Sequence, residues 1–326
     1  MKIVIAGGSG FLGRALSARL EADAHDVVVL TRRAVAGSGR IRYVTWQPDG
    51  TAPPPDAGQP AGWAREVENA DAIVNLAGEG IADRRWTTSR KRALLDSRVH
   101  STRSLIAAIR AASERPQTFV QASGVGYYGV AGDDVLDESS PPGSDFLAGL
   151  CMNWEAEARA VEALGCRLTI IRNGVVLARH GGALKRMLPP FMLFVGGPIA
   201  DGRQYFSWIA LDDWTGLVAW VLTTTTVSGA LNGAAPEPVT NAQFSKALGR
   251  AVHRPSWLTV PGFALRLLVG ELADYGLITG QRVVPKRAQS LGFEFKYPGI
   301  DAALVEAVRP RNYSTRSATT GSTRRT

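Results

Sequence analysis

Short apolar runs and helical patterns alternate along the first half of the chain. Five runs each have the length of one buried strand, and they cover residues 2–6, 27–30, 73–76, 119–122 and 168–172. Between them, apolar residues recur at helical spacing over residues 11–21, 90–112 and 146–164. This order of strands and helices predicts an α/β fold with a doubly wound parallel sheet.

The alternation weakens after residue 189, and helical patterns at 241–248 and 262–272 indicate a smaller α-rich lobe. The expected organisation is a sheet domain over residues 1–185, with part of its sheet completed from 200–235, a lobe over 186–308 and a tail over 309–326. The tail is rich in Ser, Thr and Arg, which predicts disorder. The longest apolar stretch, residues 187–200, contains three prolines and is too short to cross a bilayer, so we expect no membrane partner.

The net charge of +8 is concentrated in two segments. Residues 307–326 carry five arginines and no acid, and residues 83–103 carry a net +5, so the rest of the chain is slightly acidic. The tail is either a solvated terminus or a tether to nucleic acid or lipid. The internal run has no aromatic stacking platform, and we therefore expect no nucleic-acid partner.

A glycine motif follows the first predicted strand. Gly7, Gly10 and Gly13 have the spacing G-x-x-G-x-x-G, with Phe11 and Leu12 at the start of the first helix. A pyrophosphate binds to backbone N–H groups at such a helix N-terminus, where side chains would block it. We assign Gly7 to the tight turn, Gly10 to the close approach of the ligand and Gly13 to helix packing. A purely structural glycine turn is the alternative.

The end of the second strand selects between the two nicotinamide dinucleotides. An acid there would accept hydrogen bonds from both ribose hydroxyls of NAD, but this chain has Thr31, Arg32 and Arg33. Two arginines and a hydroxyl suit a 2′-phosphate. We therefore predict NADP(H) in preference to NAD(H). Ordinary surface arginines are the alternative interpretation of Arg32 and Arg33.

Several further motifs resemble one protein family. They are VNLAGEGI at residues 74–81, RRW at 84–86, ASGVGYYG at 122–129, CMNWE at 151–155 and QRVVPKRAQSLGFEFKYP at 281–298. Together with the glycine motif, they resemble the atypical extended short-chain dehydrogenase/reductases of the NAD(P)-dependent, nucleoside-diphosphate-sugar epimerase family, over residues 1–308. The resemblance implies a Rossmann domain that binds the dinucleotide, and a characteristic C-terminal domain that forms the substrate lobe.

Ordinary members of this superfamily exchange a proton through a Tyr-x-x-x-Lys pair, and no tyrosine of this chain has a lysine four residues later. Register with the family helix places Leu147 at the tyrosine position and Cys151 at the lysine position. Cys151 and Glu155 then share one helix face, which the resemblance directs toward the nicotinamide. We take Ser123, Tyr127 and Glu155 as candidate catalytic residues, and Cys151 and Glu155 as candidate cofactor contacts. The alternatives are core packing for Cys151 and Tyr127, and a structural or ribose-binding role for Glu155.

The ends of two other strands complete the candidate cofactor site. Leu76, Ala77 and Gly78 follow one strand and are expected beside the diphosphate and ribose, and Ala122 ends another. Glu79 either accepts a hydrogen bond from a ribose hydroxyl or is a solvated loop acid. Within the basic run, Arg84, Arg85 and Arg98 are candidates to bind an anionic substrate or a cofactor phosphate, and a solvated helix face is the alternative.

Two hypotheses of function remain open. The first is an NADP(H)-dependent epimerase, dehydratase or reductase that acts on a small, nucleotide-sugar-like molecule. The second is an NADPH-binding regulatory or interaction protein without ordinary redox turnover, which the replacement of the Tyr-Lys pair favours. Two cysteines and four scattered histidines show no disulfide or metal spacing, so we expect no metal. The chain begins on a strand pattern, which predicts a cytoplasmic protein, and a homodimer is expected by analogy with the fold.

Overall fold

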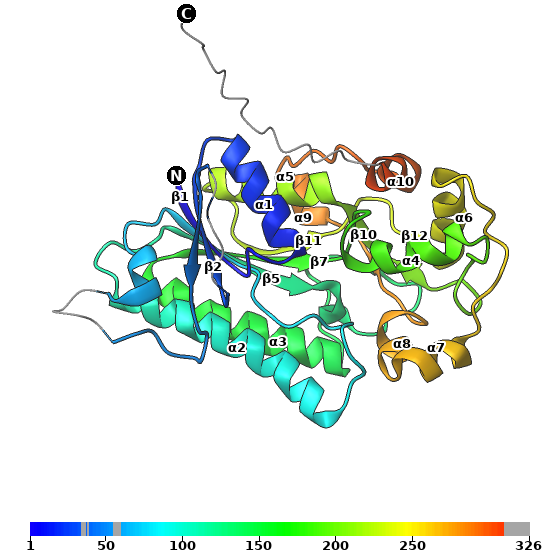
Figure 1. Ribbon diagram of the computed structural model, residues 1–326, viewed down its shortest axis with the longest axis horizontal. Coiled ribbons are helices and arrows are strands. Elements are labelled where there is room, and N and C mark those ends of the chain that lie inside the picture. Colours follow the sequence, from blue (N-terminus) through cyan, green and yellow to red (C-terminus); the bar gives the residue numbers. More distant parts are fainter. Residues whose placement is uncertain (34–36, 38, 55–59, 310–326) are drawn as a thin grey trace, which may run out of the picture.

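A seven-stranded parallel sheet forms the centre of the computed structural model, which describes residues 1–33, 37, 39–54 and 60–309 (Figure 1). The strand order is β11-β7-β5-β4-β1-β2-β3. The strands are β1 (Lys2–Ala6), β2 (Asp26–Thr31), β3 (Ile41–Thr45), β4 (Ala72–Asn75), β5 (Thr118–Gly124), β7 (Arg167–Asn173) and β11 (Gly229–Gly233). The order reverses direction between β1 and β4, which is where open α/β sheets bind ligands. The predicted fold class, a Rossmann-type doubly wound sheet with an α-rich C-terminal part, is confirmed.

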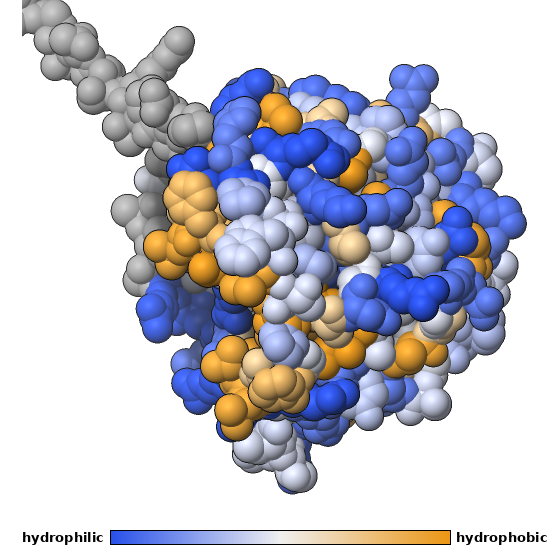
Figure 2. Space-filling view, turned by 90° about the vertical axis from the view of Figure 1, so that its right-hand side faces the viewer, coloured by the Kyte–Doolittle hydropathy of each residue, from blue (hydrophilic) through white to orange (hydrophobic). Residues whose placement is uncertain are grey.

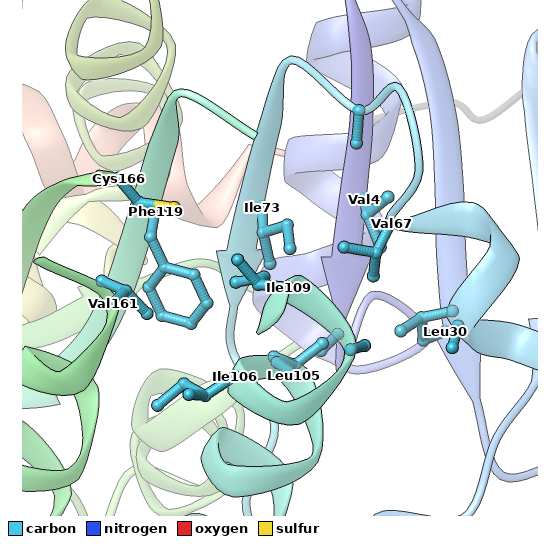
Figure 3. Packing of buried hydrophobic residues seen from close by; sticks show 14 of the residues in the cluster. Val4, Leu30, Val67, Ile73, Leu105, Ile106, Ile109, Phe119, Val161 and Cys166 are labelled. Carbon is cyan, nitrogen blue, oxygen red and sulfur yellow. The ribbon is translucent and has the colours of Figure 1, made fainter. Parts of the chain in front are cut away.

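Helices cover both faces of this sheet. Helices α1 (Phe11–Ala22) and α5 (Leu211–Thr223) pack on one face, and α2 (Thr88–Ala111) and α3 (Phe146–Ala158) pack on the other (Figure 1). Figure 3 shows the second face, where Ile73 and Phe119 of the sheet lie against Leu105, Ile106 and Ile109 of α2. The inner strands therefore bury side chains on both sides, which explains their mainly apolar sequences.

The C-terminal lobe packs around its own apolar cluster, which contains the buried Phe191, Trp208, Phe244 and Leu304. Its helices are α4 (Gly182–Met192), α6 (Asn241–Ala251), α7 (Gly262–Val269), α8 (Leu272–Gly276), α9 (Lys286–Ser290) and α10 (Ile300–Val308). Three short strand pairs lie outside the central sheet: β8 (Val175–Leu177) with β10 (Trp208–Ala210), β9 (Tyr205–Phe206) with β12 (Val239–Thr240), and β6 (Val135–Leu136) with β13 (Arg282–Val283). Short 3₁₀ turns lie at Gly62–Glu66, Val125–Tyr128 and Arg159–Leu164.

The structure differs from the sequence prediction in several elements, among them the following four. The helix expected over 146–164 continues beyond Ala158 only as a 3₁₀ turn, and the helix expected over 262–272 is divided at Gly270, whose φ is +66°. Strand β3 was missed because it is an edge strand with partly exposed side chains. Helix α4 was missed because it contains Pro189 and Pro190, which cannot donate the N–H of an intrahelical hydrogen bond and so argue against a helix in the sequence. The expected disorder of the tail concerns residues that, apart from Arg309, lie outside the described part of the chain.

Most of the exposed large apolar side chains of the described residues belong to the C-terminal lobe. They lie in residues 192–195, at Trp257 and Leu258, and on α7, where Phe263, Leu267 and Leu268 are each at least 70% exposed. Figure 2 views the molecule from the side of this lobe and shows apolar side chains grouped on that surface. Within the described ranges, no helix is both long and apolar enough to cross a membrane.

Candidate functional site

The glycine motif forms the turn between β1 and α1. Gly7 has φ of +77°, and a Cβ there would lie 2.7 Å from the Leu76 carbonyl oxygen, so β4 approaches this turn too closely for a side chain. A Cβ on Gly13 would lie 2.3 Å from the Gly8 Cα. Gly10 is the N-cap of α1 and has an ordinary φ of −73°. These contacts agree with a turn at Gly7 and helix packing at Gly13, while the ligand contacts expected of Phe11 and Leu12 stay predictions.

The N-terminus of α1 is open to a ligand. No side chain caps it, and the only heavy atom within 4 Å of a Cβ built on Gly10 is the Gly7 carbonyl oxygen, at 3.2 Å. The free N–H groups of the first turn and the helix dipole favour an anion at this position. The residues at this end of the sheet therefore fit a pyrophosphate.

A cleft of about 350 Å³ extends from this helix end toward β2 and β4. Its lining consists of Gly7, Ser9, Gly10, Leu30, Thr31, Arg32, Trp46, Pro48, Leu76, Ala77, Gly78, Glu79 and Ser97. Eight of the predicted cofactor residues therefore line one cavity: Gly7, Gly10, Thr31, Arg32, Leu76, Ala77, Gly78 and Glu79. The cleft lies at the carboxyl ends of β1, β2 and β4, across the reversal of strand order.

Two arginines at the end of β2 have no acidic partner among the described residues, and one of them lines this cleft. Thr31 is buried, and its hydroxyl donates to Ser9 Oγ at 3.3 Å and accepts from the Arg33 amide at 3.4 Å. Arg32 and Arg33 are exposed, and neither side chain has a hydrogen bond or an ion pair with a described residue. Arg32 lines the cleft, whereas Arg33 does not. Guanidinium groups without an acidic partner are available to a phosphate at this edge.

Glu79 and three arginines of the basic run differ in their surroundings. Glu79 forms an ion pair with Arg90, which also donates to the Gly80 carbonyl oxygen, so its carboxylate is not free in this structure. Arg84 is exposed, and the exposed Arg85 donates to the carbonyl oxygens of residues 266 and 267. Arg98 is buried directly behind Gly78. Of the three arginines proposed to bind an anion, only Arg98 is therefore buried, and it lies behind Gly78, a residue that lines the cleft.

A buried ion pair joins α3 to β7 beside the end of β5. Arg172 Nε donates to Glu155 Oε1 and Arg172 Nη2 donates to Oε2, both at 2.9 Å. Ser123 Oγ donates to the same Oε1 at 2.7 Å. The carboxylate raises the pKa of the Arg172 guanidinium further above its ordinary value, against the opposing effect of burial. All three side chains are at most 5% exposed, so Glu155 is fully hydrogen-bonded where a proton-transfer role was proposed.

Two adjacent tyrosines surround the Arg172 guanidinium in different ways. Tyr128 donates its hydroxyl proton to Asn232 Oδ1 at 2.8 Å and accepts from Arg172 Nη1 at 3.1 Å, and burial raises its pKa to about 12. Tyr127 stacks its ring on the guanidinium, with the Arg172 Cζ 3.4 Å from the ring centroid. Its hydroxyl has no hydrogen bond to a described residue, and the side chain is partly exposed. Tyr127 therefore has the phenol that remains available to a ligand.

The helix positions that would carry the Tyr-Lys pair face the same region and are apolar. Leu147 is 8% exposed and packs against Gly126. A Cβ built on Gly126 would lie 3.0 Å from the Leu147 Cβ. Cys151 is 5% exposed, and its Sγ lies 3.6 Å from the Gly124 carbonyl oxygen. Burial raises the pKa of the Cys151 thiol. Ala122, on β5, is also buried, and cofactor contacts at Ala122 and Cys151 stay predictions.

Sequence reasoning did not foresee the partners of these residues. Arg172 was recognised only as the end of a strand, and Tyr128 and Asn232 were not assigned a role in the network. A signal existed in Arg172 itself, because an arginine that ends a buried strand needs an acidic partner. Trp208 of β10 and Asp213 of α5 are also buried. Trp208 donates to the Glu237 carbonyl oxygen, and Asp213 accepts from the amides of Lys296 and Tyr297.

Comparison with known proteins identifies the family to which this chain is similar. The model of the NAD dependent epimerase/dehydratase family matches residues 3–232, and a domain of unknown function, DUF1731, matches residues 260–307. An epimerase family protein of Mycobacterium tuberculosis is 41% identical over 302 residues, which are 93% of this chain and 96% of that protein. The crystal structure of the human epimerase family protein SDR39U1 (isoform 2) with NADPH superposes with a TM-score of 0.82, at 35% identity, over 94% of this chain and 99% of that chain. A Corynebacterium glutamicum nucleoside-diphosphate sugar epimerase superposes with a TM-score of 0.72 at 32% identity, over 94% of this chain and 57% of that one.

Proposed function

Because the chain belongs to the NAD-dependent epimerase/dehydratase family, we propose that it binds NADP(H) in the described cleft and acts on a small, nucleotide-sugar-like substrate. The observation that carries this proposal is the uncapped N-terminus of α1 at Gly10, which faces the same cavity as Arg32. The helix end suits a pyrophosphate, and the arginine suits a further phosphate. A dinucleotide with a 2′-phosphate satisfies both.

The preference for NADP(H) over NAD(H) rests on the end of β2. No carboxylate follows Thr31 that could accept hydrogen bonds from two ribose hydroxyls, and Arg32 and Arg33 have no acidic partner among the described residues. The 2′-phosphate of NADP(H) would give these guanidinium groups a counter-charge. The NADPH in the crystal structure of the human relative supports this choice.

The substrate would lie above β5 and β7, beside the half of the cofactor that extends past β4. NADP(H) supplies a hydride donor or acceptor at its nicotinamide ring. Tyr127 has the free phenol at this position, so we assign proton exchange with a substrate hydroxyl to Tyr127. Ser123 and Glu155 hold Arg172 in place, and we assign both to positioning of the network.

A second candidate is an NADPH-binding protein without ordinary redox turnover. The observation that favours it is the apolar pair Leu147 and Cys151, because neither side chain can replace a tyrosine and a lysine in proton exchange. Glu155 is also occupied by two hydrogen bonds from Arg172 and one from Ser123. This second candidate binds NADPH at the same site as the first, and the two differ only in whether the bound NADPH is oxidised by a substrate.

A titration of the purified protein with NADPH and NADH tests the shared part of both candidates. We expect NADPH to bind at least tenfold more tightly, and equal affinity would contradict the assignment of Arg32 and Arg33. Oxidation of bound NADPH, followed by absorbance with a panel of carbonyl compounds and nucleotide sugars, then separates the candidates. Turnover with any compound supports the enzyme, and tight NADPH binding without turnover supports the binding protein. The homodimer and the cytoplasmic location stay predictions.

A further inference from the structure

Arg98 of α2 is a buried cation without an acidic partner. The residue is 8% exposed, and its guanidinium lies over the ring of Trp154, with Cζ 4.9 Å from the centroid. Nη1 donates to the Leu94 carbonyl oxygen at 2.9 Å. Nε is buried and has no hydrogen-bond partner, and Nη2 has none among the described residues. Most of its donor capacity is therefore unused.

Other arginines of the same helix are paired. Arg90 pairs with Glu79, Arg92 with Asp96 and Arg103 with Glu157. Glu79 is the acid whose charge acts on Arg98, and its carboxylate is already paired with Arg90. Burial lowers the pKa of Arg98 to about 10, which leaves the guanidinium charged at neutral pH. An unpaired buried charge costs stability, and such groups are normally satisfied by a counter-charge or a ligand.

The position of Arg98 behind a residue that lines the cleft indicates what this ligand is. Its side chain lies against Gly78, which follows β4 and lines the cleft, and an added Cβ on Gly78 would be 3.1 Å from both Cγ and Cζ of Arg98. Its guanidinium also packs on Trp154 of α3, the helix that follows β5. The pyrophosphate position is at β1 and the 2′-phosphate position at β2, so the nicotinamide half of the cofactor extends over β4 and β5.

We propose that Arg98 binds the ribose hydroxyl oxygens on the nicotinamide side of NADP(H). This inference rests on the proposed function and adds a second cationic contact at the opposite end of the cofactor from Arg32. A guanidinium has donors in a fixed fork, which suits the two adjacent hydroxyl oxygens of a ribose.

Two ligands distinguish this contact from a general effect on the cleft. NADPH contains the nicotinamide ribose, whereas 2′,5′-ADP contains only the adenine half with its 2′-phosphate. We expect Arg98→Met to raise the Kd of NADPH at least tenfold and to change the Kd of 2′,5′-ADP less than twofold. Arg98→Lys keeps the positive charge but loses the paired N–H donors of the guanidinium, so it should raise the Kd of NADPH only a few fold. Arg92→Met, which removes an exposed arginine of the same helix, should change neither.

Unchanged NADPH binding by Arg98→Met, or an equal loss for both ligands, would overturn the inference and leave a packing role for Arg98. Circular dichroism shows whether Arg98→Met folds. If it does not, the comparison is made with Arg98→Lys. An unchanged Kd of NADPH in Arg98→Lys then overturns the inference. A wild-type protein that binds neither ligand contradicts the proposed function itself. The two failures are thus distinguishable by whether the wild-type protein binds NADPH.

Discussion

Glu155 and Arg172 form a two-bonded ion pair that is shielded from solvent, with Nε–Oε1 and Nη2–Oε2 distances of 2.9 Å. The pair connects α3 to β7, and its third member, Ser123, belongs to β5. Because Arg172 also contacts both Tyr127 and Tyr128, one guanidinium orders the whole edge of the sheet where substrate is expected. The orientation of Tyr127 therefore depends on an ion pair in which it has no part.

Removal of Glu155 should destabilise the protein far more than removal of a partly exposed acid on the same helix. Glu155→Ala leaves the Arg172 charge buried without a partner, which typically costs about 3–5 kcal/mol. Glu157→Ala breaks a partly exposed pair with Arg103 and should cost at most about 1 kcal/mol. Thermal unfolding of the two variants measures the contrast, and similar Tm values would show that the buried pair is not important for stability.

The glycine turn could be predicted from sequence, and the ion pair could not. Gly7, Gly10 and Gly13 act within one turn that their own spacing defines, and Arg32 follows from its position at a strand end. Arg172 lies 17 residues from Glu155 in an apolar run, and their contact depends on how α3 packs against β7. The sequence identified Arg98 only as one of three arginines that were candidates to bind an anionic substrate or a cofactor phosphate. Its burial behind Gly78 is a property of tertiary packing, which the charge pattern of a single helix does not contain.

Tyr128 should make stability depend on alkaline pH. Its folded pKa of about 12 lies above the ordinary value of 10, so between these pH values the unfolded chain loses a proton that the folded chain keeps. The free energy of unfolding therefore falls as pH rises through this range, and the contribution is complete below pH 10. Tyr128→Phe should be less stable by about 1–3 kcal/mol at pH 8, because Asn232 and Arg172 each lose a buried hydrogen bond.

The measurement is the urea midpoint of both proteins between pH 8 and pH 11. The urea midpoint of the wild type should exceed that of Tyr128→Phe by a constant amount up to about pH 10, and this difference in midpoint should become smaller above pH 10. A difference that stays constant through pH 11 would mean that burial does not hold the phenol in its protonated form.

Gly10→Ala should abolish cofactor binding with little effect on folding. Its φ of −73° is accessible to alanine, and the new methyl group would occupy the space in front of the α1 N-terminus, where the pyrophosphate is expected. We expect the Kd of NADPH to rise more than tenfold and the free energy of unfolding to change by about 1 kcal/mol or less. Gly149→Ala is the matched control, because its Cβ meets nothing within 4 Å in the middle of α3. It should stabilise the helix by about 0.5–1 kcal/mol and leave NADPH binding unchanged.

Arg32 and Arg33 should determine the choice between the two dinucleotides. Each charge-assisted bond to a phosphate contributes about 1.5–3 kcal/mol, so Arg32→Ala should raise the Kd of NADPH by at least about tenfold. NADH lacks the 2′-phosphate, and its Kd should change less than twofold in the same variant. Arg33 does not line the cleft, so Arg33→Ala should have the smaller effect. Isothermal titration measures both ligands, and a parallel loss of NADPH and NADH affinity would assign Arg32 to another part of the cofactor.

Tyr127→Phe tests whether the free phenol at this edge takes part in chemistry. The ring would still stack on Arg172, so the network should remain intact and the Kd of NADPH should stay within about twofold. If the hydroxyl exchanges the substrate proton, kcat with any substrate found in the panel should fall by about 10²–10⁴-fold, the usual contribution of general acid–base catalysis. Glu155→Gln loses charge within the buried pair, so it should lower stability as well as kcat. Turnover that is unchanged in both variants would exclude Tyr127 and Glu155 from the reaction, and turnover that is lost only together with stability would leave Glu155 as a structural residue.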